Sequence, residues 1–123
     1  MTRCAFNEAE ALLAVHLQEL SLHFQQHYRY VPGRKFEADF AVWRNKPAEW
    51  QDEPPPFYRF ALIEVQGGVY SKQAHGSVTG ILKDDERLYW AFRSGWGVLR
   101  FTPDQVMDGT AKTMIAAALG REP

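Results

Sequence analysis

The sequence is poor in cysteine, in long hydrophobic runs and in net charge. Cys4 is its single cysteine, which excludes an internal disulfide and a zinc site built from cysteines. The N-terminal residues form no hydrophobic signal segment, and no apolar run reaches the roughly 18 residues that span a bilayer. We therefore expect a soluble protein in a reducing compartment such as the cytoplasm.

The formal net charge is −1, so binding to nucleic acid would have to rest on local clusters of cations. No internal repeat is visible. One biased segment, PAEWQDEPPP at residues 47–56, is typical of an extended loop. A length of 123 residues and a hydrophobic share of 46% suit one folded domain with a single core, spanning residues 1–123.

Apolar residues recur at helical spacing over residues 6–28, which predicts one amphipathic helix there. At 100° per residue, Glu10 lies within about 40° of the centre of the apolar stripe, whereas Glu8 projects on the opposite side. Glu10 is thus the acid that this helix should turn inward.

Two further segments, RKFEADFAVW at 34–43 and FYRFALIEV at 57–65, predict strands that pair antiparallel around the proline-rich loop. In the pairing that we expect, Asp39 lies opposite Glu64, and period-two geometry turns both acids and Gln66 to one face. The other face then carries Phe40, Val42, Ile63 and Val65. Both faces are largely apolar, which is typical of a sheet covered by helices on both sides.

The remaining chain predicts a helix, a strand and a helix. The helix before the strand begins at residue 77 or 78 and ends before GW at 95–96, and the strand is GVLRF at 97–101. Thr-Pro-Asp-Gln at 102–105 is a helix start, and the last helix should run to Leu119. In the helix that begins at residue 77 or 78, the expected buried side consists of Val78, Ile81, Leu88, Tyr89 and Phe92. A helix, two or three strands, a helix, a strand and a helix make an α/β domain with a mixed central sheet.

The residues suited to catalysis or metal binding are the acids Asp39 and Glu64, with Glu10 reaching toward them from the helix over residues 6–28. Carboxylates that converge at one sheet edge repel each other, and a divalent cation removes that cost. Oxygen ligands without cysteine favour magnesium, or manganese, which can activate water to hydrolyse a phosphodiester. Alternatively, the strand acids are solvated or paired with arginine, and Glu10 forms a salt bridge.

The ordered set PGRKFEADFAVW, ALIEVQGGVY, His75, Gly80, Asp84 and GWGVLRFT resembles the PD-(D/E)XK nuclease superfamily. It is most similar to small bacterial and phage endonucleases related to the very-short-patch-repair and DUF559-type enzymes. The resemblance covers roughly residues 8–108. It implies a restriction-endonuclease-like core and magnesium-dependent hydrolysis of DNA that leaves a 5′-phosphate.

Carried over residue by residue, the resemblance makes Asp39 and Glu64 the metal-binding acids and the carbonyl of Val65 a further ligand. Glu10 matches the first-helix glutamate found in many members, or Glu8 does if the alignment slips. Gln66 takes the position that is lysine in the superfamily's name. The helix acid is Asp84, and the loop motif is matched by Gly67, Gly68 and His75. A plain alternative is that these glycines mark a turn and that the histidine is a surface residue.

The chain departs from this pattern at its cations. The helix lysine of the branch is Arg87 here, and Gln66 carries no charge, so it can orient water but supplies no cation. Lys72 and Lys83 are the nearest replacements. Arg87 can stabilise the charge on the leaving group but stays protonated, which makes it a poor proton donor.

Basic residues near the acids predict contacts to a DNA backbone, with RNA as another substrate class. Arg34 and Lys35 precede the first acid-bearing strand, and Lys83 follows the second, so a ring of cations would grip phosphates without recognising sequence. For any one of these residues taken singly, a solvated surface is the better explanation. The small size favours a structure-selective or nicking enzyme, and the loop at 47–56 is assigned to a partner or to a homodimer. The competing hypothesis is a degenerate nuclease fold that only binds nucleic acid or a protein.

Overall fold

The computed structural model describes the backbone of residues 2–44, 60–66 and 78–119, with side chains from residue 8 in the first range and from residue 82 in the last. The proline-rich segment 47–56 lies outside these residues. In order, the elements are α1 (Thr2–Glu19), β1 (His23–Tyr28), β2 (Ala38–Trp43), β3 (Phe60–Val65), α3 (Val78–Arg93), β4 (Gly97–Phe101), α4 (Pro103–Met107) and α5 (Thr110–Ala118).

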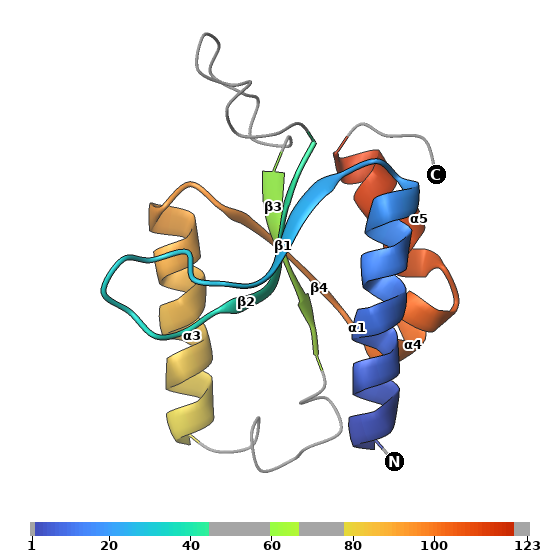
Figure 1. The fold of residues 1–123 in the computed structure, drawn as a ribbon. Coiled ribbons are helices and arrows are strands. Elements are labelled where there is room, and N and C mark those ends of the chain that lie inside the picture. The colour runs from blue at the N-terminus through green and yellow to red at the C-terminus, as the bar shows by residue number, and fades with distance from the viewer. Residues whose placement is uncertain (1, 45–59, 67–77, 120–123) are drawn as a thin grey trace, which may run out of the picture.

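The described strands form one mixed sheet in the order β1-β2-β3-β4. Strand β2 pairs antiparallel with both β1 and β3, whereas β4 pairs parallel with β3. Helix α3 covers one face of the sheet, and α1, α4 and α5 cover the other (Figure 1). The expected α/β class with a mixed central sheet and flanking helices is confirmed. No described helix combines the length and the apolar character that crossing a membrane requires.

Each face of the sheet has its own hydrophobic cluster. The larger cluster joins α1, α4 and α5 to the sheet, and it contains the four strand residues predicted for one face: Phe40, Val42, Ile63 and Val65. The smaller cluster lies on the α3 side and is rich in aromatic rings around Trp43, which contacts Tyr28 and Trp96 edge to face. Alternation along β2 and β3 therefore separates the two clusters.

The predicted register between β2 and β3 is confirmed. Phe40 pairs with Ile63, and Trp43 pairs with Phe60. One step beyond Phe40, the same antiparallel register sets Asp39 opposite Glu64. The two acids therefore lie at one end of the β2–β3 ladder.

The prediction of one helix over residues 6–28 is wrong, because α1 ends at Glu19 and residues 23–28 form β1. Ser21 adopts a left-handed conformation with φ 58°. The amide of Leu22 donates to the carbonyl of Leu17 at 3.1 Å, and the amide of Ser21 donates to the carbonyl of Gln18 at 2.9 Å. This is a Schellman motif, which is usually formed by glycine. Because serine and not glycine occupies this left-handed position, the sequence pattern did not indicate that the helix ends here.

Helix α3 has the predicted boundaries, but the face that it turns to the sheet is not the predicted one. Leu88, Tyr89 and Phe92 are exposed, and Ala91 is buried instead. Asp84 and Arg87 lie on the inward side, where they bind charged residues of the sheet. Ion pairing with the sheet therefore set the rotation of α3. Val78 and Ile81 lie outside the described side chains.

The helix start at Thr102 is confirmed as a capping box. The Thr102 hydroxyl accepts from the amide of Gln105 at 3.2 Å, and the Gln105 side chain accepts from the amide of Thr102 at 2.9 Å. However, the predicted continuous last helix is two helices. Gly109, with φ 88°, breaks it between α4 and α5.

Candidate functional site

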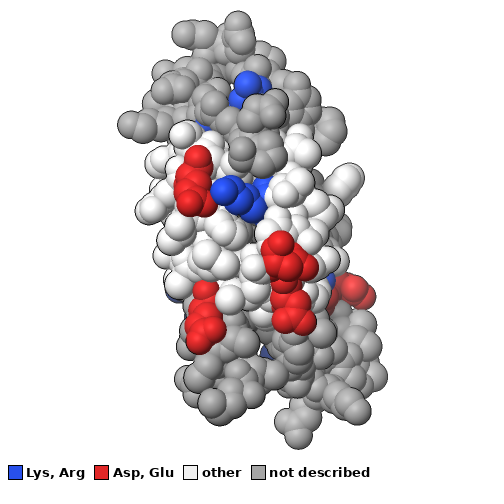
Figure 2. All heavy atoms as spheres, turned by 90° about the vertical axis from the view of Figure 1, so that its right-hand side faces the viewer, with Lys and Arg blue, Asp and Glu red and all other residues white. Residues whose placement is uncertain are grey.

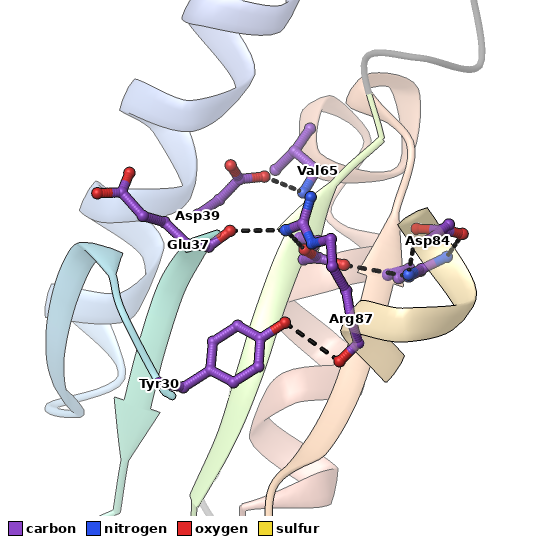
Figure 3. Close-up of polar contacts among 8 residues, drawn as sticks. Tyr30, Glu37, Asp39, Val65, Asp84 and Arg87 are labelled. Carbon is purple, nitrogen blue, oxygen red and sulfur yellow. Dashed lines mark hydrogen bonds and ion pairs between the residues drawn. The ribbon is translucent and has the colours of Figure 1, made fainter. Parts of the chain in front are cut away.

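The two acids predicted to act together approach each other at the end of the β2–β3 ladder. Figure 3 shows the Asp39 carboxylate directed at β3, where its Oδ2 accepts a hydrogen bond from the backbone amide of Val65 at 2.8 Å. The Oδ1 atom of Asp39 has no hydrogen-bond donor within the described part of the chain. Asp39 is thus anchored by one oxygen and presents the other.

Glu64 points to the α3 side of the sheet and is held by two arginines. Arg100 is its partner in the parallel β3–β4 register, and the Nε of Arg100 donates to Oε1 of Glu64 at 3.1 Å. Arg87 reaches in from α3 and donates to Oε2 of Glu64. Only 14% of the Glu64 side chain is exposed, so both contacts act where solvent screening is weak.

Arg87 is the residue that connects the helix to both acid-bearing strands. One terminal nitrogen also donates to the backbone carbonyl of Glu37 at 2.6 Å, just before β2. The Tyr30 hydroxyl donates to the backbone carbonyl of Arg87 at 3.2 Å (Figure 3). The Nε atom of Arg87 is buried and has no hydrogen-bond partner among the described residues. Arg87 therefore keeps donor capacity beside the acids.

Burial dominates the electrostatics of the three acids. It raises the pKa of Asp39, although the Val65 amide and the charge of Arg87 oppose the rise. Burial likewise raises the pKa of Glu64 against the attraction of its two arginines. For Glu10 on α1, burial and the charge of Asp39 both raise the pKa. A further positive charge at this end of the sheet would stabilise the ionised form of each acid.

The expected inward placement of Glu10 is confirmed, since it is half-buried and lies within the field of Asp39. Glu8, which the alternative alignment would use, is exposed. Even so, no three acids, histidines or cysteines within the described ranges are grouped closely enough to hold a metal ion together. Glu10 therefore influences the pair electrostatically and does not complete a set of three ligands with it.

The predicted residues Gly67, Gly68, Lys72 and His75 lie outside the described residues. Gln66 is described, and its amide donates to the carbonyl of Phe101 at 2.7 Å, which continues the pairing of β3 with β4. Lys83 is exposed on α3. The structure therefore brings together Asp39, Glu64, Arg87 and Glu10, and the amide of Val65 on β3 binds Asp39.

The predicted basic residues before β2 line a hollow of their own. An open hollow of about 440 Å³ is formed by the segment from Tyr28 to Lys35, which includes Arg29 and Arg34. Arg34 binds Glu86 of α3 at 3.1 Å and lies over the ring of Trp90, whose centroid is 5.1 Å away. The hollow lies in the segment that leads to Asp39.

The opposite side of the molecule has a different charge pattern. On the face made by α1, α4 and α5, separate acidic patches surround a small basic patch (Figure 2). Within the described residues this face has no continuous basic surface.

Three residues of the site were not assigned a role from the sequence. Arg100 binds Glu64 and Asp84 together, and a charged residue inside the otherwise apolar GVLRF segment was the available signal. His27 stands opposite Asp39 by the β1–β2 register, has φ 54°, and its charge lowers the pKa of Asp39. It was missed because residues 23–28 were expected to be helical. Tyr30 gave no signal in the sequence.

The donors suit magnesium in type and number. Magnesium is typically held by one or two carboxylates and several waters, and Asp39 offers a carboxylate oxygen without a donor. Each Glu64 oxygen binds one arginine and keeps a second lone pair. Asp39 would be the principal ligand and Glu64 a ligand shared with the arginines.

The chain matches no protein-family model, no curated protein and no solved structure. Evidence on function therefore comes from the geometry of the site and from the motif resemblance.

Proposed function

We propose that the chain is a metal-dependent endodeoxyribonuclease with a restriction-endonuclease-like core, acting in the cytoplasm. The observation that carries the proposal is the β2–β3 register, which sets Asp39 opposite Glu64 at one end of the sheet. Both acids are largely buried, and burial raises the pKa of each. Such a pair is stabilised by a cation, and acid pairs of this kind support phosphodiester hydrolysis.

In this proposal Asp39, Glu64 and the carbonyl of Val65 hold magnesium or manganese. The metal supplies an activated water and stabilises negative charge on the phosphate. The Arg87 guanidinium lies beside Glu64 and can stabilise negative charge on the phosphate. Gln66 orients water, and Glu10 keeps negative charge near Asp39.

The proposed substrate is DNA, cut at its backbone without long-sequence recognition. The basic segment 28–35 leads toward β2, which carries Asp39, and would contact phosphates, which carry no sequence information. A nicking or structure-selective role in recombination, repair or phage DNA processing follows from this. Lys72, His75 and the glycines at 67 and 68 keep the roles that the resemblance assigns to them, and a 5′-phosphate is the expected product.

The test is cleavage of supercoiled plasmid, branched DNA and RNA with magnesium or manganese. Asp39→Asn and Glu64→Gln remove charge with little change of shape, and each should abolish cleavage. Asp108→Asn, at an exposed acid between α4 and α5, is the matched control and should cleave like the wild type, because asparagine keeps the oxygen that accepts from the amide of Thr110. Cleavage that survives in both site variants would refute the assignment.

Metal binding can be measured without knowledge of the substrate. Titration calorimetry with manganese should give binding heat for the wild type and for Asp108→Asn, and none for Asp39→Asn. Circular dichroism of each variant shows that lost binding does not reflect unfolding. A wild type that binds no manganese with or without DNA contradicts the proposal.

A second candidate is a degenerate nuclease fold that binds phosphate without cutting. It is favoured by the contact of both Glu64 oxygens with arginines, which compensates that acid without a metal. Its signature is DNA binding with no cleavage of any substrate, and affinity that falls in Arg34→Gln and not in Asp39→Asn. The manganese titration separates the two candidates.

A further inference from the structure

Helix α3 exposes a stripe of large apolar side chains. The exposed fractions are 62% for Leu82, 38% for Leu88, 54% for Tyr89 and 84% for Phe92. These residues recur at spacings of three, four and seven along the helix, so they share one side of it. We name these four residues the α3 stripe. Monomeric proteins rarely expose contiguous apolar surface of this kind.

The stripe is exposed because the other side of α3 is occupied by charge. Asp84 and Arg87 face the sheet and bind Arg100 and Glu64. A rotation that buried the stripe would leave Glu64 without Arg87, at 14% exposure. Loss of one partner from such a pair is strongly destabilising. The fold therefore cannot bury the stripe against its own sheet.

The charges beside the stripe indicate what covers it. Asp85 lies on the side of α3 that carries the stripe, between Leu82 and Leu88 in sequence. It has no hydrogen bond or ion pair with another described residue. An apolar or acidic partner would leave this carboxylate desolvated without a cation, which is costly. Arg93 lies on the same helix, eight positions further on, or about 12 Å along the axis. Its side chain is exposed and contacts Tyr89 and Trp90.

We propose that the α3 stripe is the interface of a homodimer in which two copies of α3 pack antiparallel about a two-fold axis near Tyr89. Tyr89 is midway between Asp85 and Arg93. The two-fold therefore brings Asp85 of each chain to Arg93 of the other, twice per dimer. A parallel arrangement would set like charges against each other. The antiparallel arrangement also opposes the two helix dipoles.

Other occupants fit the stripe less well. A DNA backbone is disfavoured because Asp85 and Glu86 carry negative charge beside the stripe. An acidic protein surface is disfavoured for the same reason. A second copy supplies the apolar surface and the cation together. Helix α3 is about 24 Å long, so a pair of such helices buries less than a standard interface, and the dimer should dissociate at about micromolar concentration.

The first test is sedimentation velocity of the full chain over a range of concentration. The wild type should change from monomer to dimer, and Phe92→Glu should be monomeric throughout. Met114→Glu is the matched control, because Met114 is 51% exposed on α5, on the other side of the sheet. It should dimerise like the wild type. Equal loss of dimer in both variants, or a wild type that is monomeric at all concentrations, overturns the proposal.

The second test exchanges the two charges and identifies the arrangement. Asp85→Arg and Arg93→Asp should each weaken the dimer by about tenfold, because two like-charge contacts replace two favourable ones. The double variant should restore wild-type affinity. An equal mixture of the two single variants should form a heterodimer, since each chain then supplies the charge that the other lacks.

The charge exchange also covers the case in which Phe92→Glu does not fold. Single variants that dimerise as well as the wild type would overturn the antiparallel interface. A mixture that forms no heterodimer would overturn it as well. None of these residues belongs to the acid pair, so the outcome is independent of nuclease activity.

Discussion

Arg100 of β4 and Asp84 of α3 form a two-pronged ion pair across the layer boundary. Both terminal nitrogens of Arg100 donate to Asp84, each at 2.8 Å, while its Nε donates to Glu64. Two parallel hydrogen bonds between a guanidinium and a carboxylate fix orientation as well as distance. This pair sets how α3 lies on the sheet, and therefore where Arg87 meets Glu64.

Replacing Arg100 with glutamine should destabilise the fold by about 2 kcal/mol, because it removes the two-pronged pair with Asp84 and one of the two arginines that hold Glu64. Urea denaturation followed by circular dichroism gives the free energy of unfolding. Arg34→Gln is the control, since the Arg34–Glu86 pair is about half exposed and should contribute no more than about 0.5 kcal/mol. Equal losses in the two variants would show that the buried pair does not organise α3.

The stability of the fold should fall as the pH drops below the ordinary histidine value because of His16. Burial and Lys112 lower the pKa of His16 from its usual 6.5, and its buried Nδ1 has no partner among the described residues. The unfolded chain therefore binds a proton at a higher pH than the native state. The resulting stability is present above pH 6.5 and is lost as the pH falls below that value through the lower pKa of the native state.

The measurement for His16 is urea denaturation at a series of pH values between about 7.5 and 5.5, a range centred on the ordinary histidine pKa. His16→Gln cannot titrate, so its loss of stability over this range should be smaller than that of the wild type. Lys112 and Glu19 are the charged groups that act on His16, and neither is altered. The same pH slope in both proteins would contradict this role.

Manganese should raise the melting temperature if the proposed site is correct. A ligand that binds only the native state stabilises it by about 2.7 kcal/mol at a concentration one hundred times its dissociation constant. Asp39→Asn should show no rise, and a chelator should return the wild type to its metal-free melting temperature. A rise of the same size in Asp39→Asn would place manganese elsewhere on the chain.

Thr102→Ala should lower the free energy of unfolding by about 1 kcal/mol, because it removes the oxygen that caps α4. Differential scanning calorimetry should show the loss. Thr113→Ala is the control, since Thr113 is exposed within α5 and caps nothing, so stability should stay level or rise slightly. A comparable loss in both variants would mean that the capping box contributes little.

Local patterns predicted the strands and their register well. Alternation in ADFAVW and FALIEV placed Phe40 and Ile63 on one face, and the observed pairs agree. The capping box at Thr102 and the stop at Gly95, with φ 85°, were also predictable, because both depend on neighbouring residues. Asp39 and Glu64 came together from that register alone.

The end of α1 and the rotation of α3 were not predictable in the same way. Residues 23–28 have apolar spacing that fits a helix, and they become a strand because β2 offers an open edge for pairing. The apolar side of α3 was expected inside, yet the sheet binds its charged side. Both outcomes depend on partners that are distant in the sequence.

The sequence alone therefore determined the class of fold, the strand register and the meeting of the two acids. These follow from residue alternation and turn chemistry, which act over a few residues. The tertiary structure decided that Glu64 binds Arg87 and Arg100 and that α3 presents an apolar stripe to solvent. A buried carboxylate requires a cation, and only the packed fold shows which cations can reach it.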